Sequence, residues 1–343
     1  MYIVQSYPLA ILFCFITMLC WGSWGNTQKL AGKTWRYELF YWDYVIGILL
    51  FSLVWALTVG SCGTEGRKFL PDLAQASWGN IGSAFVGGVV FNAANILLSA
   101  AIAVAGMAVA FPVGIGLALV LLAELIYLVL GVLINYIGSA KGDPVLLFGG
   151  VALVIVAIVL NGIAYKMISR GNRSAASSRG IVLALLAGLL MSFFYRFVAA
   201  SMDLDNFVTP AAGKMTPYSA MVVFAVGIFL STFIFNSIAM KRPVSGTPVS
   251  ISAYFKGGFP IHLVGVLGGV IWGLGNALNL IAAGKAGAAI SYGLGQGATL
   301  VAALWGVFVW KEFRGGGRRV DWLLGWMFAL FVAGIGLIIA AGN

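Results

Sequence analysis

Apolar residues dominate this chain in long runs, and the polar residues are confined to the short gaps between those runs. Each run is close to the ~20 residues that a helix needs to cross the hydrocarbon core of a membrane. The pattern therefore predicts an all-α integral membrane protein with ten transmembrane helices. These helices are expected to begin near Pro8, Tyr44, Ile81, Val113, Pro144, Gly180, Ala220, Ile261, Ala288 and Trp322.

The composition supports this interpretation. Of the 343 residues, 61% are hydrophobic and 9% are charged, and the mean hydropathy is +1.01, whereas soluble domains contain about 25% charged residues. Membrane lipid is thus an expected partner. The net charge of +10 could indicate nucleic-acid binding, but the basic residues lie in short loops and form no continuous stripe. We therefore expect no nucleic-acid partner.

The distribution of the basic residues predicts an orientation in the membrane. The loops on one side of the predicted helices hold fourteen of the 20 Lys and Arg residues, and the loops on the other side hold five. Because loops rich in Lys and Arg stay in the cytoplasm, the more basic side is expected to be cytoplasmic. Both termini are then predicted to lie outside the cytoplasm.

The chain also contains an internal duplication. When the chain is shifted by 181 residues, thirteen of the 34 pairs beginning with Gly87 to Val120 are identical, and Asn95 falls on Asn276. Each copy has five predicted helices, an odd number, so the second copy must be inverted relative to the first. We predict a first repeat at 1–166, a basic cytoplasmic loop at 167–179 and a second repeat at 180–343. One such pair makes a monomer sufficient in principle.

Three charged side chains in or beside the predicted helices could serve transport. Glu124 lies in the middle of a helix, where a charge costs at least ~2.5 to 3.5 kcal/mol and should face a cavity or a partner. It could carry a proton across, or it could stay neutral and serve packing. Arg196 either reaches water at the outer end of its helix or faces the cavity, pairing with Glu124 or holding solute oxygens. Asp43, at the start of the second helix, is either interfacial or lines the cavity.

Neutral polar and aromatic side chains are the other candidates for solute binding. Amides offer both donors and acceptors, and aromatic rings can stack on a sugar or on a flat ring. Each amide could instead join helices, and the tryptophans could belong to the membrane interface. The substrate-binding candidates are Asn95, Asn276, Gln296, Trp21, Trp24, Trp272, Tyr292, Arg196 and Asp43.

Two glycine-rich segments, Val113–Gly116 and Gly293–Gly297, follow no strand and lack the Lys-Ser/Thr of a nucleotide loop. They predict helices that either pack closely or unwind at the cavity. The chain has one histidine, His262 at a helix end, and three cysteines without metal-ligand spacing. We assign none of them a role, and we expect neither enzyme activity nor a metal or cofactor.

Several short segments resemble those of a known superfamily. They are Cys20–Trp24, Gly269–Asn276, Ile290–Gln296 and Trp310–Phe313, and, separately, Met1–Ser6, Tyr41–Tyr44 and Leu133–Tyr136. The first four resemble bacterial sugar-uptake members of the drug/metabolite transporter superfamily, and the last three look like plant ureide permeases. The chain is thus similar to the glucose/ribose porter and ureide permease group, to which the rhamnose-proton symporter is related.

The resemblance covers nearly the whole chain, although Lys166 to Arg179 is a short substitute for the large central loop of plant ureide permeases. It implies a secondary active transporter in a bacterial-type cytoplasmic (inner) membrane. Proton-coupled uptake of a monosaccharide is the leading expectation, with the proton gradient as the coupling force. The alternatives are a ureide or nucleobase permease and a metabolite exporter, and a channel is a further option.

Overall fold

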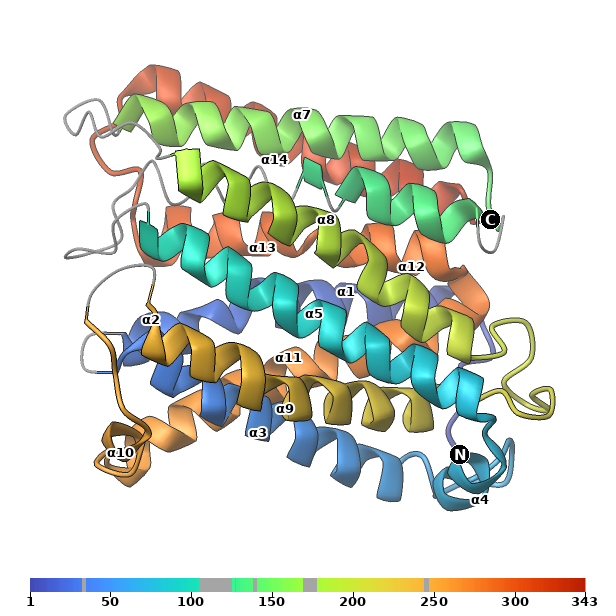
Figure 1. Ribbon diagram of the computed structural model, residues 1–343. Coiled ribbons are helices and arrows are strands. Elements are labelled where there is room, and N and C mark those ends of the chain that lie inside the picture. Colours follow the sequence, from blue (N-terminus) through green and yellow to red (C-terminus); the bar gives the residue numbers. More distant parts are fainter. Residues whose placement is uncertain are drawn as a thin grey trace.

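The computed structural model describes residues 1–32, 35–104, 125–126, 128–137, 141–168, 178–243 and 247–342. Its long helices lie side by side with roughly parallel axes, and the two chain ends lie at the same end of the bundle (Figure 1). We call this end the termini end and the opposite end, where the short helix α10 (Ile251–Tyr254) lies, the α10 end. A hydrogen bond from the Tyr7 hydroxyl to the Ile339 carbonyl ties the two chain ends together.

The remaining named elements follow in chain order. They are α1 (Tyr7–Ser23), α2 (Gly25–Ala31), α3 (Tyr37–Leu57), α4 (Phe69–Gln75), α5 (Trp78–Val104), α7 (Pro144–Ile168), α8 (Ser178–Ser201), α9 (Pro217–Lys241), α11 (Phe259–Ala286), α12 (Ala288–Gly295), α13 (Ala298–Leu304), the π-helix η2 (Trp305–Val309) and α14 (Arg318–Ala340).

Length and composition make most of these helices able to cross a membrane. Within the described residues, eight spans are long and apolar enough. They are Tyr7–Ala31, Tyr37–Leu57, Trp78–Leu98, Pro144–Ile168, Pro217–Lys241, Phe259–Ala286, Ala288–Val309 and Arg318–Ala340. Leu128–Ile137 and Leu185–Ser201 are shorter apolar helices. The helix expected near Val113 begins outside the described residues, so the number of ten helices stays a prediction.

The helices associate in pairs that recur along the chain. Helix α11 packs against α1 and α3, while α5 packs against α8 and α9; α3 also packs on α9, and α7 packs on α14. Glycines bring several of these backbones together. A side chain on Gly269 of α11 would overlap the Tyr44 carbonyl of α3, and one on Gly88 of α5 would overlap the Phe224 carbonyl of α9.

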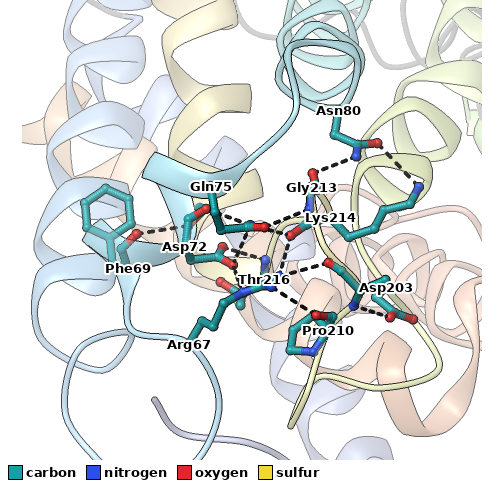
Figure 2. Close-up of polar contacts among 12 residues, drawn as sticks. Arg67, Phe69, Asp72, Gln75, Asn80, Asp203, Pro210, Gly213, Lys214 and Thr216 are labelled. Carbon is teal, nitrogen blue, oxygen red and sulfur yellow. Dashed lines mark hydrogen bonds and ion pairs between the residues drawn. The ribbon is translucent and has the colours of Figure 1, made fainter.

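At the termini end a polar network joins α4 and the loop before it to the segment before α9 (Figure 2). Asp72 of α4 is fully buried, and it accepts hydrogen bonds from Arg67 Nε (2.9 Å) and from the Thr216 backbone N–H (2.7 Å). Arg67 also donates to backbone carbonyls of the 210–214 segment, and Gln75 accepts from the Gly213 N–H (2.7 Å). We call Arg67, Asp72, Gln75, Gly213 and Thr216 the termini latch.

The second predicted helix begins earlier than the apolar pattern indicated. Helix α3 starts at Tyr37 rather than near Tyr44, because its first turn includes the polar residue Glu38 outside the apolar run. An acidic side chain is favourable in that position, at the positive end of the helix dipole. As a consequence, Asp43 lies inside the helix rather than at its start, and it is 1% exposed.

Candidate functional site

A cluster of aromatic rings surrounds Trp272 in the middle of α11. The Trp272 ring is stacked on Trp21 of α1, with 6.1 Å between ring centroids and 12° between planes. Phe91 of α5 lies 4.5 Å from it and Phe224 of α9 lies 6.1 Å from it. Four helices, drawn from both predicted repeats, therefore meet at one tryptophan.

Polar atoms without partners lie beside these rings. Trp272, Asn276 and Asn279 share one face of α11, because residues spaced by four and three lie above one another on a helix. Asn276 is 1% exposed, and its Nδ2 donates to the Met221 sulfur at 3.0 Å. Its Oδ1, the Asn279 Oδ1 and the Trp21 indole N–H have no hydrogen-bond partner among the described residues.

An interrupted helix completes the cluster. Helix α12 ends at Gly295, and Gln296 and Gly297 form a turn before α13 begins. A side chain on Gly295 would overlap the Trp21 ring, so a glycine there lets α12 contact α1 closely. Gln296 is 2% exposed, and its Nε2 donates to the Tyr292 carbonyl at 3.3 Å. The second glycine-rich segment therefore both packs closely and breaks the helix.

We call Trp21, Trp272, Asn276, Asn279 and Gln296 the central site. Its unpaired carbonyl oxygens can accept hydrogen bonds and its indole N–H can donate one. Leaving a buried polar group unpaired costs about 1–3 kcal/mol, so a hydrogen-bonding partner at these atoms would be favourable. Asn279 was missed by the sequence analysis; its spacing of three from Asn276 on an apolar helix was the available signal.

The two asparagines matched by the duplication have different surroundings. Asn95 Nδ2 donates to the Tyr41 hydroxyl at 3.3 Å, and Tyr41 donates to Asn92 Oδ1 at 2.6 Å. Asn92 in turn donates to Ser231 and Thr232 of α9, at 2.8 and 3.0 Å. This network joins α3, α5 and α9, and the sequence analysis missed Asn92 although it lies one helical turn before Asn95.

The other aromatic candidates lie around the central site. The Trp24 ring, between α1 and α2, is half-buried and lies 4.7 Å from that of Tyr44. Tyr292 is fully buried, with its ring 5.2 Å from Tyr195 of α8.

Asp43 is joined to two residues that the sequence analysis left without a role. The Tyr254 hydroxyl of α10 donates to Asp43 Oδ1, and His262 Nδ1 of α11 lies 2.9 Å from the same oxygen. Burial and the neighbouring carboxylate raise the pKa of the Tyr254 phenol above its usual value. This cluster joins α3, α10 and α11 at the α10 end.

The remaining candidates contribute less to the described site. Arg196 is half-buried on α8 and has neither a hydrogen bond nor an ion pair with another described residue. Glu124 and the Val113–Gly116 segment lie outside the described residues. A surface hollow of about 570 Å³ at the termini end is lined by residues 1–5 and 58–65, and it contains none of the predicted binding residues.

Comparison with known proteins identifies the family. The sequence model of the family described as Ureide permease matches residues 40–179 and 169–341. The chain belongs to the ureide permease family. Ureide permease 2 of Arabidopsis thaliana is 24% identical, with 100% of this chain and 99% of the relative covered. Ureide permease 1 of the same plant is 23% identical with the same coverage.

Two further comparisons also cover nearly the whole chain. Probable ureide permease A3 of Vigna unguiculata is 23% identical, over 93% of this chain and 99% of the relative. One solved crystal structure superposes on this ureide permease family member with a TM-score of 0.57 at 14% identity, covering 97% of this chain and 96% of the other. At that identity the superposition shows a shared fold alone.

Family membership decides the class of protein. The chain is an integral membrane transporter of small polar solutes rather than an enzyme, because its relatives are permeases. The comparisons favour the ureide permease alternative over the monosaccharide that the sequence analysis placed first. The similarity to glucose/ribose porters and to the rhamnose symporter stays a prediction.

Proposed function

We propose that this ureide permease family member takes up a planar solute with a urea-like edge, a ureide or a nucleobase, in symport with protons. The observation that carries the proposal is that the buried Asn276 Oδ1 of α11 and the Trp21 indole N–H of α1, whose ring stacks on Trp272 of α11, both lack a partner among the described residues. A urea-like group presents N–H donors and a C=O acceptor on one edge, and these complement the two unpaired atoms.

The rings at the central site support a flat solute. Aromatic rings prefer offset-stacked or edge-to-face arrangements, each worth about 0.5–1.5 kcal/mol beyond area burial. Trp21 and Trp272 are already close to parallel, so a planar ring beside them extends an existing stack. The printed names of the plant relatives agree with this class of solute.

The packing of the helices supports the two inverted five-helix repeats. When the chain is shifted by about 180 residues, α1, α3 and α5 coincide with α8, α9 and α11. The packing of α11 on α1 and α3 then corresponds to the packing of α5 on α8 and α9. The central site then lies between the halves, as in other inverted-repeat carriers. A monomer suffices in this arrangement.

Two hydrogen-bonded clusters lie at opposite ends of the described bundle, which suits alternating access. The termini latch lies at one end (Figure 2), and Asp43 with Tyr254 lies at the other. We infer that the halves rock so that one of these clusters opens at a time. In this proposal the membrane is a bacterial-type cytoplasmic membrane, with the α10 end in the cytoplasm and the termini outside. The excess of Lys and Arg in the loops of the α10 end supports that orientation. The proton-coupling role that the sequence suggests for Glu124 stays a prediction, because Glu124 lies outside the described residues.

The test is equilibrium binding to the purified protein in detergent, with allantoin, uracil, glucose, ribose and rhamnose as ligands. We expect allantoin or uracil to bind, and we expect Asn276→Ala to weaken that binding about tenfold, the effect of losing one hydrogen bond worth ~1.4 kcal/mol. Asn161→Ala is the matched control, because Asn161 is a buried asparagine of α7 away from the central site.

Unchanged affinity in Asn276→Ala would overturn the assignment of the site. Binding of a sugar but of neither allantoin nor uracil would return the solute to the monosaccharide class. An equal loss of affinity in Asn161→Ala would show that general destabilisation, rather than a lost contact, explains the result.

A further inference from the structure

Three polar side chains from different elements meet at the α10 end. Asp43 of α3 is 1% exposed, and it accepts a hydrogen bond from the Tyr254 hydroxyl of α10. His262 Nδ1 of α11 lies 2.9 Å from Asp43 Oδ1 and 3.1 Å from Oδ2. The His262 ring also packs edge-on against Tyr254 and Trp35, at 4.6 and 5.3 Å between centroids.

Two glycines make room for this cluster. A side chain on Gly265 of α11 would overlap the Asp43 side chain, so the glycine allows α11 to approach α3 at this carboxylate. A side chain on Gly257 would lie 2.6 Å from His262 Nε2, so this glycine lets the segment after α10 lie directly on the imidazole. The carboxylate and the imidazole are therefore held in a close-fitting setting.

The contacts define where a proton can be held. An ionised carboxylate only accepts hydrogen bonds, so His262 Nδ1 must carry a hydrogen to bond with Asp43. The raised pKa of Tyr254 keeps its phenol protonated and donating to the same carboxylate. His262 Nε2, beside Gly257, is then the atom that can gain a proton.

Other charged groups of the neighbouring elements are engaged elsewhere or face solvent. Lys29 of α2 pairs with Glu312 at 2.7 Å, and Arg36 pairs with Glu38 at 2.6 Å. Lys241 of α9 and Lys256 after α10 are exposed. Among the described residues, Asp43 is thus faced by His262, Tyr254 and Trp35.

We propose that Asp43 and His262 together bind the coupling proton, on His262 Nε2, while α10 covers them, and release it to the cytoplasm when α10 moves away. This inference rests on the proposed proton-coupled uptake. With His262 neutral the buried pair has a net charge of −1, and a proton makes it net neutral, which burial favours. When α10 leaves, water solvates the carboxylate, so that preference weakens.

Linkage fixes the sign of the pH effect. The closed arrangement binds the proton more strongly than the open one, so lowering the pH stabilises the closed arrangement. As the pH rises, the closed arrangement loses this stabilisation. An α10 that opens more at high pH is the expected behaviour.

The test measures the rate at which maleimide labels a cysteine on α10 in the full-length protein without solute. Ala253→Cys reports closure because Ala253 is half-buried on α10, and Phe255→Cys is the control because Phe255 is 77% exposed. Both carry Cys62→Ser, since Cys62 is exposed whereas Cys14 and Cys20 are buried. The ratio of the two rates cancels the pH dependence of thiolate formation.

We expect the labelling ratio to fall when the pH is lowered from about pH 8 to about pH 5, because the closed arrangement gains the proton-bound pair. His262→Gln, which keeps an N–H donor but cannot titrate, should make the ratio independent of pH. Asp43→Asn, which removes the negative charge that favours the proton, should abolish or reverse the fall. A pH-independent ratio in the parent, or an unchanged pH dependence in both variants, would overturn the inference. Because no solute is present, failure of the solute assignment would leave this result unaffected.

Discussion

At the scale of single residues, two glycines make matching contacts in the two proposed repeats. A side chain on Gly47 of α3 would overlap the Val266 carbonyl of α11, and one on Gly227 of α9 would overlap the Phe85 carbonyl of α5. The glycines are 180 residues apart and their partners are 181 apart. The same close helix crossing therefore occurs twice, once in each pair of helices.

Replacing either glycine should destabilise the fold to a similar extent. Gly47→Ala and Gly227→Ala each force a methyl group into a backbone carbonyl, and overpacking of this kind costs about 1–3 kcal/mol. Thermal unfolding in detergent measures the effect. Gly325→Ala is the control, because nothing lies within 4 Å of the added carbon, and it should unfold at or slightly above the parent temperature.

If only one of the two substitutions lowered the unfolding temperature, the two crossings would not be equivalent, and this support for the repeat would be lost. An equal fall in the unfolding temperature of Gly325→Ala would instead show that the fold is sensitive to any glycine replacement in a helix.

At the scale of elements, the termini latch joins α4 to the segment before α9 through a buried carboxylate. Asp72 has 0% of its side chain exposed and bonds to Arg67 Nε and the Thr216 N–H. Asp205 is at the same end, but its side chain is 83% exposed in its ion pair with Lys141. A buried, hydrogen-bonded charge contributes more than an exposed ion pair, whose median worth is ~0–1 kcal/mol.

Asp72→Asn should open the latch while Asp205→Asn leaves it closed. Hydrogen bonds to charged groups contribute about 1.5–3 kcal/mol, so the amides of Gly213 and Thr216 should exchange at least about tenfold faster in Asp72→Asn. Hydrogen exchange of residues 211–216 measures this. Equal exchange in the two variants would show that Asp72 does not hold these loops.

The sequence predicted the helices better than it predicted the contacts between their ends. Helices α7 and α12 begin at Pro144 and Ala288 as expected, because a proline and a glycine-bounded apolar run mark those starts. The start of α3 was misplaced, since apolar runs mark the part of a helix in the hydrocarbon core and not the turns beyond it.

The sequence pointed to some residues of the central site but not to the contacts between distant helices. Trp21, Trp272, Asn276 and Gln296 stood out as polar or aromatic residues near glycines, and the fold gathers them at α11 and the α12 break. The pairing of Asp43 with His262 joins residues 219 positions apart. A pattern along one chain shows that both lie near helix ends, but it does not show which helix ends meet.

At the scale of the whole molecule, the arrangement has a central site with a hydrogen-bonded cluster at each end. The aromatic rings and unpaired amides lie between the termini latch and the Asp43 cluster, which come from different loops of the two halves. A carrier needs its two ends to open in turn, because opening both together would let the solute and the ion leak. The account therefore joins solute binding at α11 to proton release at α10.

Uptake into proteoliposomes that contain the purified protein tests this account most directly. Allantoin and uracil are supplied outside, with and without an inward proton gradient. The account predicts saturable accumulation of at least one of them above its outside concentration when the gradient is present, and its collapse when a protonophore removes the gradient. Equilibration to the outside concentration regardless of the gradient, or accumulation of glucose in place of both compounds, would contradict it.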